Sequence, residues 1–364
     1  MGLNMLFGYP IAATGDNWLH DCLVHAIQVI HQTVDAVEAL PKWPAIFPNA
    51  HRTKVTKLRT LPKLLEEYRA ALAVIPKADR DAVLETMHAQ NRIDGLLRCA
   101  CDCPIISDLP ETLRDPIKKV FDCGFDLLTD FKIRHEQYKH IHSSIGARVC
   151  PFCGLEEFSA PHAPQEDFDH YLPRSIYPFA AANLKNLAPM GHKCNSGYKR
   201  AQDILISDNG NRRRAFNPYQ QNQVQISLMN SEISPLTDGP FVRTWSLEIT
   251  PLAPEVATWE KIFSVQGRYT ADVLEDRNFW DWIGDFKNWF KGRPVPKDDE
   301  MLISEVSSYA DVLVSTGFRD KAFLKAAVFK FLHGRLVAGC QRVLGLMRDA
   351  TGMPQPLLTA ELAQ

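Results

Sequence analysis

The sequence lacks any long uninterrupted apolar segment. No stretch reaches the roughly 18–20 uncharged apolar residues that a membrane-spanning helix needs, so we expect no membrane span and no membrane partner. The N-terminus also lacks the basic segment followed by an apolar core that marks a signal peptide. These two absences predict a cytoplasmic protein.

The chain has no excess of either charge. Its 41 Lys and Arg residues are balanced by 43 Asp and Glu residues, which gives a formal net charge of −2. This balance excludes a uniformly basic, histone-like binder, so any nucleic-acid site has to be a local basic patch. Hydrophobic residues make up 45% of the chain, a globular composition that excludes wholesale disorder.

Cysteine is present without the pattern of a disulfide framework. The chain has nine cysteines, an odd number, and three of them crowd together at Cys99, Cys101 and Cys103. Small secreted domains use even numbers of spaced cysteines. We therefore expect reduced thiols, some of them metal ligands.

Helical periodicity dominates both ends of the chain. Apolar residues at steps of three and four predict helices over 17–40, 61–75, 80–97, 111–138 and 300–347. Alternation over residues 222–249 predicts a β-hairpin. Five tryptophans after residue 244 are interpreted as core anchors of helices that pack on the central module: Trp245, Trp259, Trp280, Trp282 and Trp289.

These patterns divide the chain into three expected regions. Residues 1–145 form a helical region for partner docking or gating, residues 146–220 form a central module, and residues 221–364 hold the hairpin and further helices. The first region carries no catalytic signature, so the chemistry is expected in the second.

Cys150 and Cys153, in the segment CPFCG, are the first candidate metal ligands. Two thiolates separated by two residues can share a tetrahedral metal ion at about 2.3 Å. Cys194, in the segment GHKC, would be a third ligand and His192 a candidate fourth. Zinc at this site would replace the core that so short a module cannot build. A chance or redox-active Cys-x-x-Cys pair is the alternative.

Asp169 and His170 lie between the two cysteine segments. An imidazole titrates near neutral pH, so His170 can accept a proton from water. Adjacent side chains of an extended segment point to opposite faces, so the two residues can serve different roles around one centre. A surface Asp-His pair without function is the alternative when the pair is considered alone.

The order of these residues resembles that of the HNH endonucleases, also called the His-Me finger or ββα-metal family. The order is Cys-x-x-Cys, Asp-His-x-x-Pro, Asn-Leu, Cys-Asn and Lys, between Cys150 and Lys199. It is similar to the variant whose last histidine is an asparagine. The resemblance implies a mainly α protein with a small central ββα-metal finger stabilised by zinc, and a short β-hairpin after it.

The resemblance also implies a role for each matching residue. His170 is the general base, and Asn186 holds the loop and the strand of that histidine. Asp169 and Asn195 hold one catalytic Mg²⁺ or Mn²⁺ ion. The structural Zn²⁺ ligands are Cys150, Cys153, Cys194 and His192. At Gly191 the sequence departs from many zinc-bearing relatives, which have a cysteine there.

The segment from Gly191 to Arg214 is the basic patch that a nucleic-acid enzyme needs. It carries six Lys or Arg residues against two Asp, a local balance of +4. Basic side chains of this kind neutralise phosphates and make binding salt-dependent. The residues expected to contact nucleic acid are Lys199, Arg200, Arg212, Arg213 and Arg214.

The expected activity is metal-dependent hydrolysis of phosphodiester bonds, with DNA as the substrate, by nicking or by double-strand cleavage. The wider layout is similar to HNH nucleases of bacterial anti-phage systems such as Septu and Zorya, which implies antiviral defence and a controlling ATPase or other operon partner. Two alternatives stay open: a zinc-stabilised module that binds nucleic acid without cutting, and a homing or restriction nuclease with its own sequence specificity.

Overall fold

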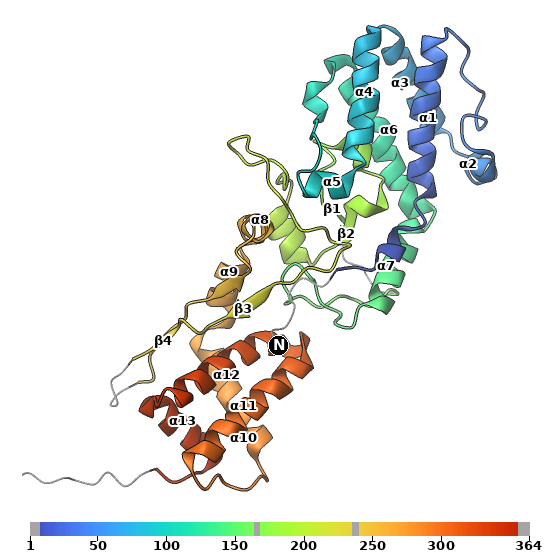
Figure 1. Ribbon diagram of the computed structural model, residues 1–364. Helices are drawn as coiled ribbons and strands as arrows, with labels where there is room; N and C mark the ends of the chain where they lie inside the picture. The colour runs from blue at the N-terminus through green and yellow to red at the C-terminus, as the bar shows by residue number, and fades with distance from the viewer. Residues whose placement is uncertain (1–7, 164–167, 235–239, 356–364) are drawn as a thin grey trace, which may run out of the picture. The chain divides into compact units, whose positions relative to one another are not determined.

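The computed structural model describes residues 8–163, 168–234 and 240–355, which form two compact units. The larger unit comprises residues 8–222 and Pro254–Phe263, and the smaller comprises residues 223–253 and 264–355. The fold is mainly helical, as predicted (Figure 1). The helical N-terminal region and the central module, with their expected boundary at residue 145, belong to the same unit.

Helices make up the first part of the larger unit. Residues 8–145 contain no strand, as the periodicity predicts. Short 3-10 turns lie at Ile11–Thr14, Asn49–His51 and Ile106–Asp108. The α-helices are α1 (Trp18–Asp35), α2 (Arg52–Val55), α3 (Thr60–Ala73), α4 (Lys77–Gln90), α5 (Ile93–Leu97), α6 (Glu111–Asp130) and α7 (Ile133–Ser144).

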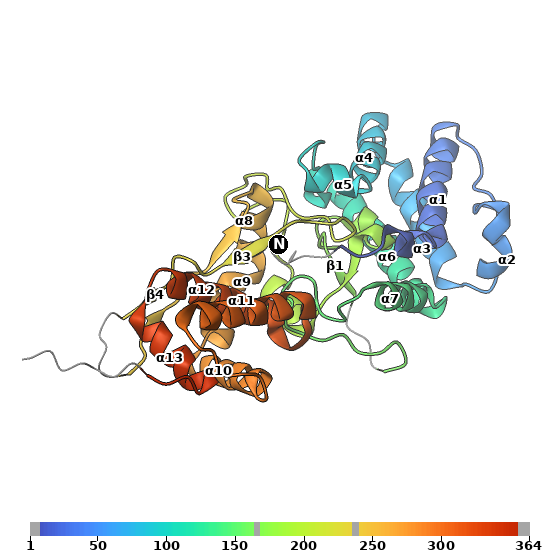
Figure 2. The ribbon, with the colours of Figure 1, turned by 60° about the horizontal axis from the view of Figure 1, so that its bottom comes forward.

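Helices α1, α3 and α6 lie side by side and enclose the core of this unit (Figures 1 and 2). The helices α1 and α6 approach closely at Gly124, where a Cβ atom would lie only 2.3 Å from Leu23 Cδ1. The same core continues into the central module through Phe168, Phe179 and Leu187. This shared apolar core is the reason that the two regions form one unit.

The central module contains a strand, a second strand and a helix in that order. Strand β1 (Phe168–His170) pairs antiparallel with β2 (Leu187–Pro189), so that His170 faces Leu187 in register. Two 3-10 turns, Pro178–Ala180 and Leu184–Asn186, lie in the connection, and a short π-type helix, Lys193–Lys199, follows β2.

Helix α8 (Pro254–Phe263) returns from a distant part of the chain to the larger unit. Its Trp259 is 3% exposed, and its indole Nε1 donates to Phe152 O at 2.9 Å. Phe152 lies between the first two cysteines, so α8 covers the Cys-x-x-Cys turn. The prediction that Trp259 anchors a helix on the central module is confirmed.

The smaller unit begins with the predicted hairpin. Strands β3 (Gln225–Ser227) and β6 (Glu248–Thr250) pair antiparallel, as do β4 (Glu232–Ile233) and β5 (Arg243–Thr244). The helices that follow β6 in this unit are α9 (Val265–Arg268), a π-type turn (Tyr269–Val273), α10 (Asp276–Phe290), α11 (Asp299–Thr316), α12 (Ala322–Val337) and α13 (Gln341–Thr351), with a 3-10 turn at Arg319–Lys321.

The tryptophan prediction is correct only in part for this unit. Trp282 is buried, whereas Trp280 is 45% exposed. The buried side of α10 carries residues such as Phe279 and Phe286, seven positions apart, and position 280 falls outside this stripe. Helix α10, which carries Trp280 and Trp282, belongs to the smaller unit, whereas the central module belongs to the larger unit.

Within the described residues, no helix combines the length and the apolar content that crossing a membrane requires.

Candidate functional site

Three buried cysteines from the two predicted segments meet in the larger unit. The Sγ atoms of Cys150, Cys153 and Cys194 lie within 4.8 Å of one another, and no disulfide joins them. The first two sit on a tight turn in which Cys150 O accepts from Gly154 N at 2.7 Å, and Gly154 has a φ of 65°, which favours glycine. The structure therefore brings together the three thiols that the spacing predicts.

The chemistry of this cluster fits a soft divalent cation. Burial and the two neighbouring thiols raise the pKa of Cys150 well above its usual value, because burial disfavours the thiolate charge and the neighbouring sulfurs oppose it further. A bound Zn²⁺ ion would supply positive charge and reverse the preference. Three buried sulfurs at this spacing suit zinc better than oxygen-seeking Mg²⁺.

His192 does not join the cysteines, so the expectation of a fourth ligand there is not met. Its side chain is exposed, and it lies outside the group of mutually close donor atoms. The physical reason is its position immediately before the helix Lys193–Lys199. Cys194, two residues later, is on the buried side of that helix.

His170 is held in one orientation on β1. Its Nε2 lies 3.0 Å from Ala181 O, and a carbonyl oxygen only accepts, so Nε2 carries the hydrogen and Nδ1 carries the lone pair. The ring packs on Phe125 with centroids 4.3 Å apart. Burial lowers the pKa of His170 to about 3, against the opposing effect of the Ala181 hydrogen bond. The imidazole is therefore neutral at neutral pH.

Asn186 braces the connection between the two strands, as expected. It is fully buried, and its Oδ1 accepts from Leu172 N at 2.7 Å. Its Nδ2 donates to Leu172 O at 3.0 Å and to Ala180 O at 3.2 Å. One amide side chain thus joins the residues after β1 to the turn that carries the Ala181 carbonyl.

The position of Lys199 differs from the one expected for a residue that contacts phosphate. The residue is fully buried, and its Nζ donates to His170 O at 2.8 Å. A buried ammonium that binds a backbone carbonyl holds the strand and cannot reach a nucleic acid without leaving it. Arg200, the next residue, is exposed and has a positive φ of 50°.

Three residues that sequence reasoning missed hold β2 from outside the module's motif. Tyr9 donates from its hydroxyl to Pro189 O at 2.5 Å, and the Tyr219 hydroxyl donates to Leu187 O. Gln137 Nε2 in turn donates to the Tyr219 hydroxyl at 2.8 Å. Only the tertiary contacts reveal these residues, because each lies far from the motif in the sequence.

The two expected Mg²⁺ ligands are less completely described. Asp169 pairs through its backbone with Ala188 in the hairpin, but its side chain lies outside the described part of the structure. Asn195 lies in the helix Lys193–Lys199 and is half-buried. The order strand, strand, helix places these two residues on the first and third elements.

A basic pocket of about 560 Å³ lies in the larger unit beside α8. Among the described residues, no acidic side chain lines it. Arg212 is partly committed to the fold, because its guanidinium donates to Leu205 O at 3.1 Å and Leu96 O at 3.0 Å. The lining residues are Cys99, Arg212, Arg213, Arg214, Pro254, Ala257, Thr258 and Lys261. Lys261 on α8 adds a cation that is not among the predicted contact residues.

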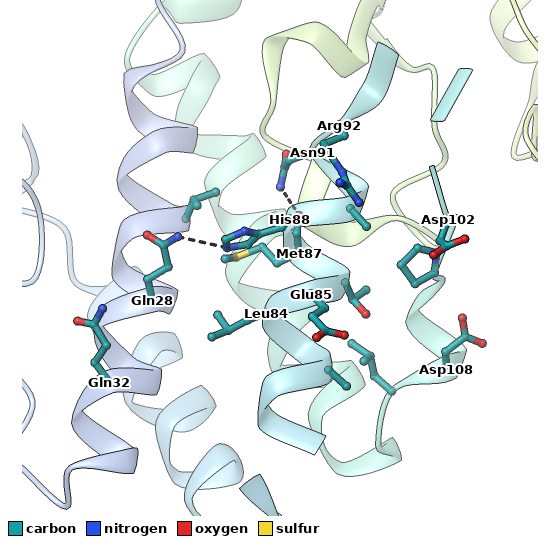
Figure 3. A pocket seen from close by; sticks show the side chains of 16 residues that line it. Gln28, Gln32, Leu84, Glu85, Met87, His88, Asn91, Arg92, Asp102 and Asp108 are labelled. Atoms are coloured by element: carbon teal, nitrogen blue, oxygen red, sulfur yellow. Dashed lines mark hydrogen bonds between the residues drawn. The ribbon is translucent and has the colours of Figure 1, made fainter. Parts of the chain in front are cut away.

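A second, larger cavity of about 1060 Å³ lies between α1, α4 and the segment around Asp102 and Asp108 (Figure 3). Figure 3 shows Gln28 of α1 and His88 of α4 joined across it, at 3.3 Å. The described lining of this cavity includes no residue predicted to be catalytic. Its Asn91 nevertheless accepts a hydrogen bond from Asn183 at 2.9 Å and therefore contacts the loop between β1 and β2.

Comparisons of the chain with protein-family models, with curated proteins and with solved structures each returned no match. The assignment of a function therefore depends on the residues and their arrangement.

Proposed function

We propose that this chain is a metal-dependent endonuclease of the HNH type that hydrolyses phosphodiester bonds in DNA. One observation carries the proposal: the neutral imidazole of His170 has Nε2 bound to Ala181 O, which makes Nδ1 its only basic atom. That histidine lies in the first strand of a strand–strand–helix segment, and the helix of this segment carries Cys194, one of three mutually close thiols.

In this proposal His170 Nδ1 accepts the proton of the attacking water as that water adds to phosphorus. The hydrogen bond to Ala181 O stabilises the imidazolium that forms, because its Nε2–H becomes a stronger donor. Asn186 and Lys199 act as positioning residues. The first holds the loop that carries the Ala181 carbonyl, and the second holds the end of β1.

Two metal sites belong to the proposal. Asp169 and Asn195 would hold a Mg²⁺ or Mn²⁺ ion, which would supply positive charge at the scissile phosphate and the leaving oxygen. The thiols of Cys150, Cys153 and Cys194 would hold Zn²⁺, which would contribute to folding rather than to the reaction.

The basic pocket beside α8 supports DNA as the substrate. Arg213, Arg214 and Lys261 offer cations without an opposing carboxylate in the described lining, which suits a phosphate backbone. A role in anti-phage defence and control by an ATPase partner belong to the same proposal, and both rest on the family resemblance alone.

The test is a nicking assay on supercoiled plasmid, with Mg²⁺, Mn²⁺ or EDTA. The wild-type chain should nick with either metal and not with EDTA, and His170→Ala should lower the rate at least about 100-fold. His140→Ala, which removes an exposed histidine of α7, is the matched control and should cut normally. Cleavage by His170→Ala at the wild-type rate would refute the assigned base. DNA binding without any cleavage would favour the non-cutting zinc module.

A further inference from the structure

The carboxylate of Glu156 lies beside the cysteine cluster and connects its two sequence segments. Oε2 accepts from Cys153 Sγ at 3.9 Å and from Cys194 N at 3.4 Å, and Oε1 accepts from Lys193 N at 2.8 Å. Both carboxylate oxygens are thus engaged by the backbone at the start of the helix, and Oε2 also lies against the Cys153 thiol.

The backbone keeps Glu156 in this place. Cys150 N donates to Glu156 O at 2.7 Å, which closes the turn that carries the first two cysteines. Because its backbone is tied to the turn that carries Cys150 and Cys153, Glu156 stays close to these two residues.

Gly191 has no side chain, and the Glu156 carboxylate occupies the space where one would lie. A Cβ atom built on Gly191 would lie 2.5 Å from Glu156 Oε2, 2.7 Å from its Cδ and 2.9 Å from its Cβ. Contacts this short with the whole side chain cannot be relieved by turning its end alone. Glycine is therefore required at position 191 by the close approach of Glu156.

The distances suit a fourth donor that completes a tetrahedral site. Zinc bonds of about 2.3 Å to sulfur and about 2.0–2.2 Å to oxygen place the two donor atoms about 3.5 Å apart. Oε2 is 3.9 Å from Cys153 Sγ and lies outside the group of three mutually close sulfurs. The carboxylate therefore has to rotate before Oε2 can bind the same metal ion as the three sulfurs. His192, the other candidate, is exposed.

We infer that Glu156 is the fourth ligand of the metal ion held by Cys150, Cys153 and Cys194, and that Gly191 is the residue that makes room for it. This inference rests on the proposal that the cysteine cluster binds zinc. The donor set is three thiolates and one carboxylate, with the second carboxylate oxygen kept on Lys193 N.

The experiment measures zinc content and affinity of the purified full-length chain by chelator competition. The wild-type chain should hold one zinc ion, and Glu156→Gln should weaken its binding at least about 10-fold. Gly191→Ala should weaken it as well, because the added Cβ displaces an unchanged Glu156. Glu157→Gln, which alters the exposed neighbouring carboxylate, is the matched control and should bind zinc like the wild type.

Cobalt substitution gives a second measurement that needs no enzymatic activity. The Co²⁺-loaded wild-type chain should show the absorption of three thiolates and one oxygen. The double variant Glu156→Gly with Gly191→Cys, in which the Cβ of residue 156 is also removed, should show stronger thiolate-to-cobalt charge transfer and ligand-field bands at longer wavelength, since a fourth thiolate replaces the carboxylate.

The two ways in which the inference can fail are distinguishable. A wild-type chain that binds neither zinc nor cobalt overturns the zinc site itself, together with this inference. A wild-type chain that binds zinc, with unchanged affinity in both Glu156→Gln and Gly191→Ala, overturns only the role of Glu156, which is then a hydrogen-bond acceptor for Lys193 N.

Discussion

Lys199 donates a hydrogen bond from Nζ to the backbone carbonyl of His170 at 2.8 Å, with its whole side chain buried. The contact joins the last residue of the short helix to the last residue of β1. The module thus holds its proposed base, His170, at two points. Lys199 binds the backbone carbonyl of His170, and Ala181 O binds its ring.

Replacing Lys199 should therefore loosen this connection. Lys199→Met keeps an unbranched side chain, one atom shorter, and removes the donors, which leaves the buried carbonyl of His170 without this partner. We expect the free energy of unfolding to fall by about 1.5–3 kcal/mol, measured by urea denaturation. Lys193→Met, at an exposed position of the same helix, should change it by less than about 0.5 kcal/mol. Equal stability of the two variants would contradict the structural role of Lys199.

Asn186→Ala should be more damaging. The substitution removes one acceptor and two donors from buried backbone groups of Leu172 and Ala180, and it leaves a small cavity. The expected loss is about 3 kcal/mol in the free energy of unfolding, again from urea denaturation. Asn211→Ala, at an exposed position, serves as the control. A loss below about 0.5 kcal/mol for Asn186→Ala would show that the loop is held by other contacts.

We expect acid to destabilise the fold because two histidines of α1 are buried. Burial lowers the pKa of His20 and of His31 from 6.5 to about 4. Between these two values the unfolded chain binds more protons than the folded chain, so stability is lost as the pH falls from 6.5 to 4. Each histidine contributes up to about 1.4 kcal/mol per pH unit in this range.

The measurement is urea denaturation of the wild type and of His31→Gln at several pH values from about 7 down to about 4, which spans this range. His31 Nε2 lies 2.6 Å from the Tyr68 hydroxyl, so the glutamine variant loses some stability at every pH. Its stability should nevertheless depend less steeply on pH than that of the wild type. An identical slope would mean that His31 does not titrate with the folding transition.

The basic pocket predicts a salt-dependent interaction with DNA. Replacing Arg214 and Lys261 together by Gln should weaken binding and lower the slope of log affinity against log salt by about 0.9 for each phosphate that is no longer neutralised. Lys63→Gln, at an exposed position of α3 outside the pocket, should leave the slope unchanged. Fluorescence anisotropy of a labelled duplex at several salt concentrations measures both. A slope unaffected by the double substitution would place the DNA elsewhere.

Local patterns were sufficient to predict the helices of both ends, the hairpin of residues 222–249 and the meeting of Cys150, Cys153 and Cys194. These features depend on periodicity or on a short spacing, which the order of side chains expresses directly. The predicted helix over 111–138 is nevertheless two helices, since α6 ends at Asp130 and Lys132 adopts a positive φ of 60° before α7.

Tertiary packing determined which side chains lie at the site. The fold placed Glu156 rather than His192 beside the thiols, buried Lys199 under His170, and brought α8 with Lys261 to the module from a distant part of the chain. Each of these outcomes depends on which face of a short element is covered by a segment remote in sequence. Packing settles that question by excluding water from one face and leaving the other exposed.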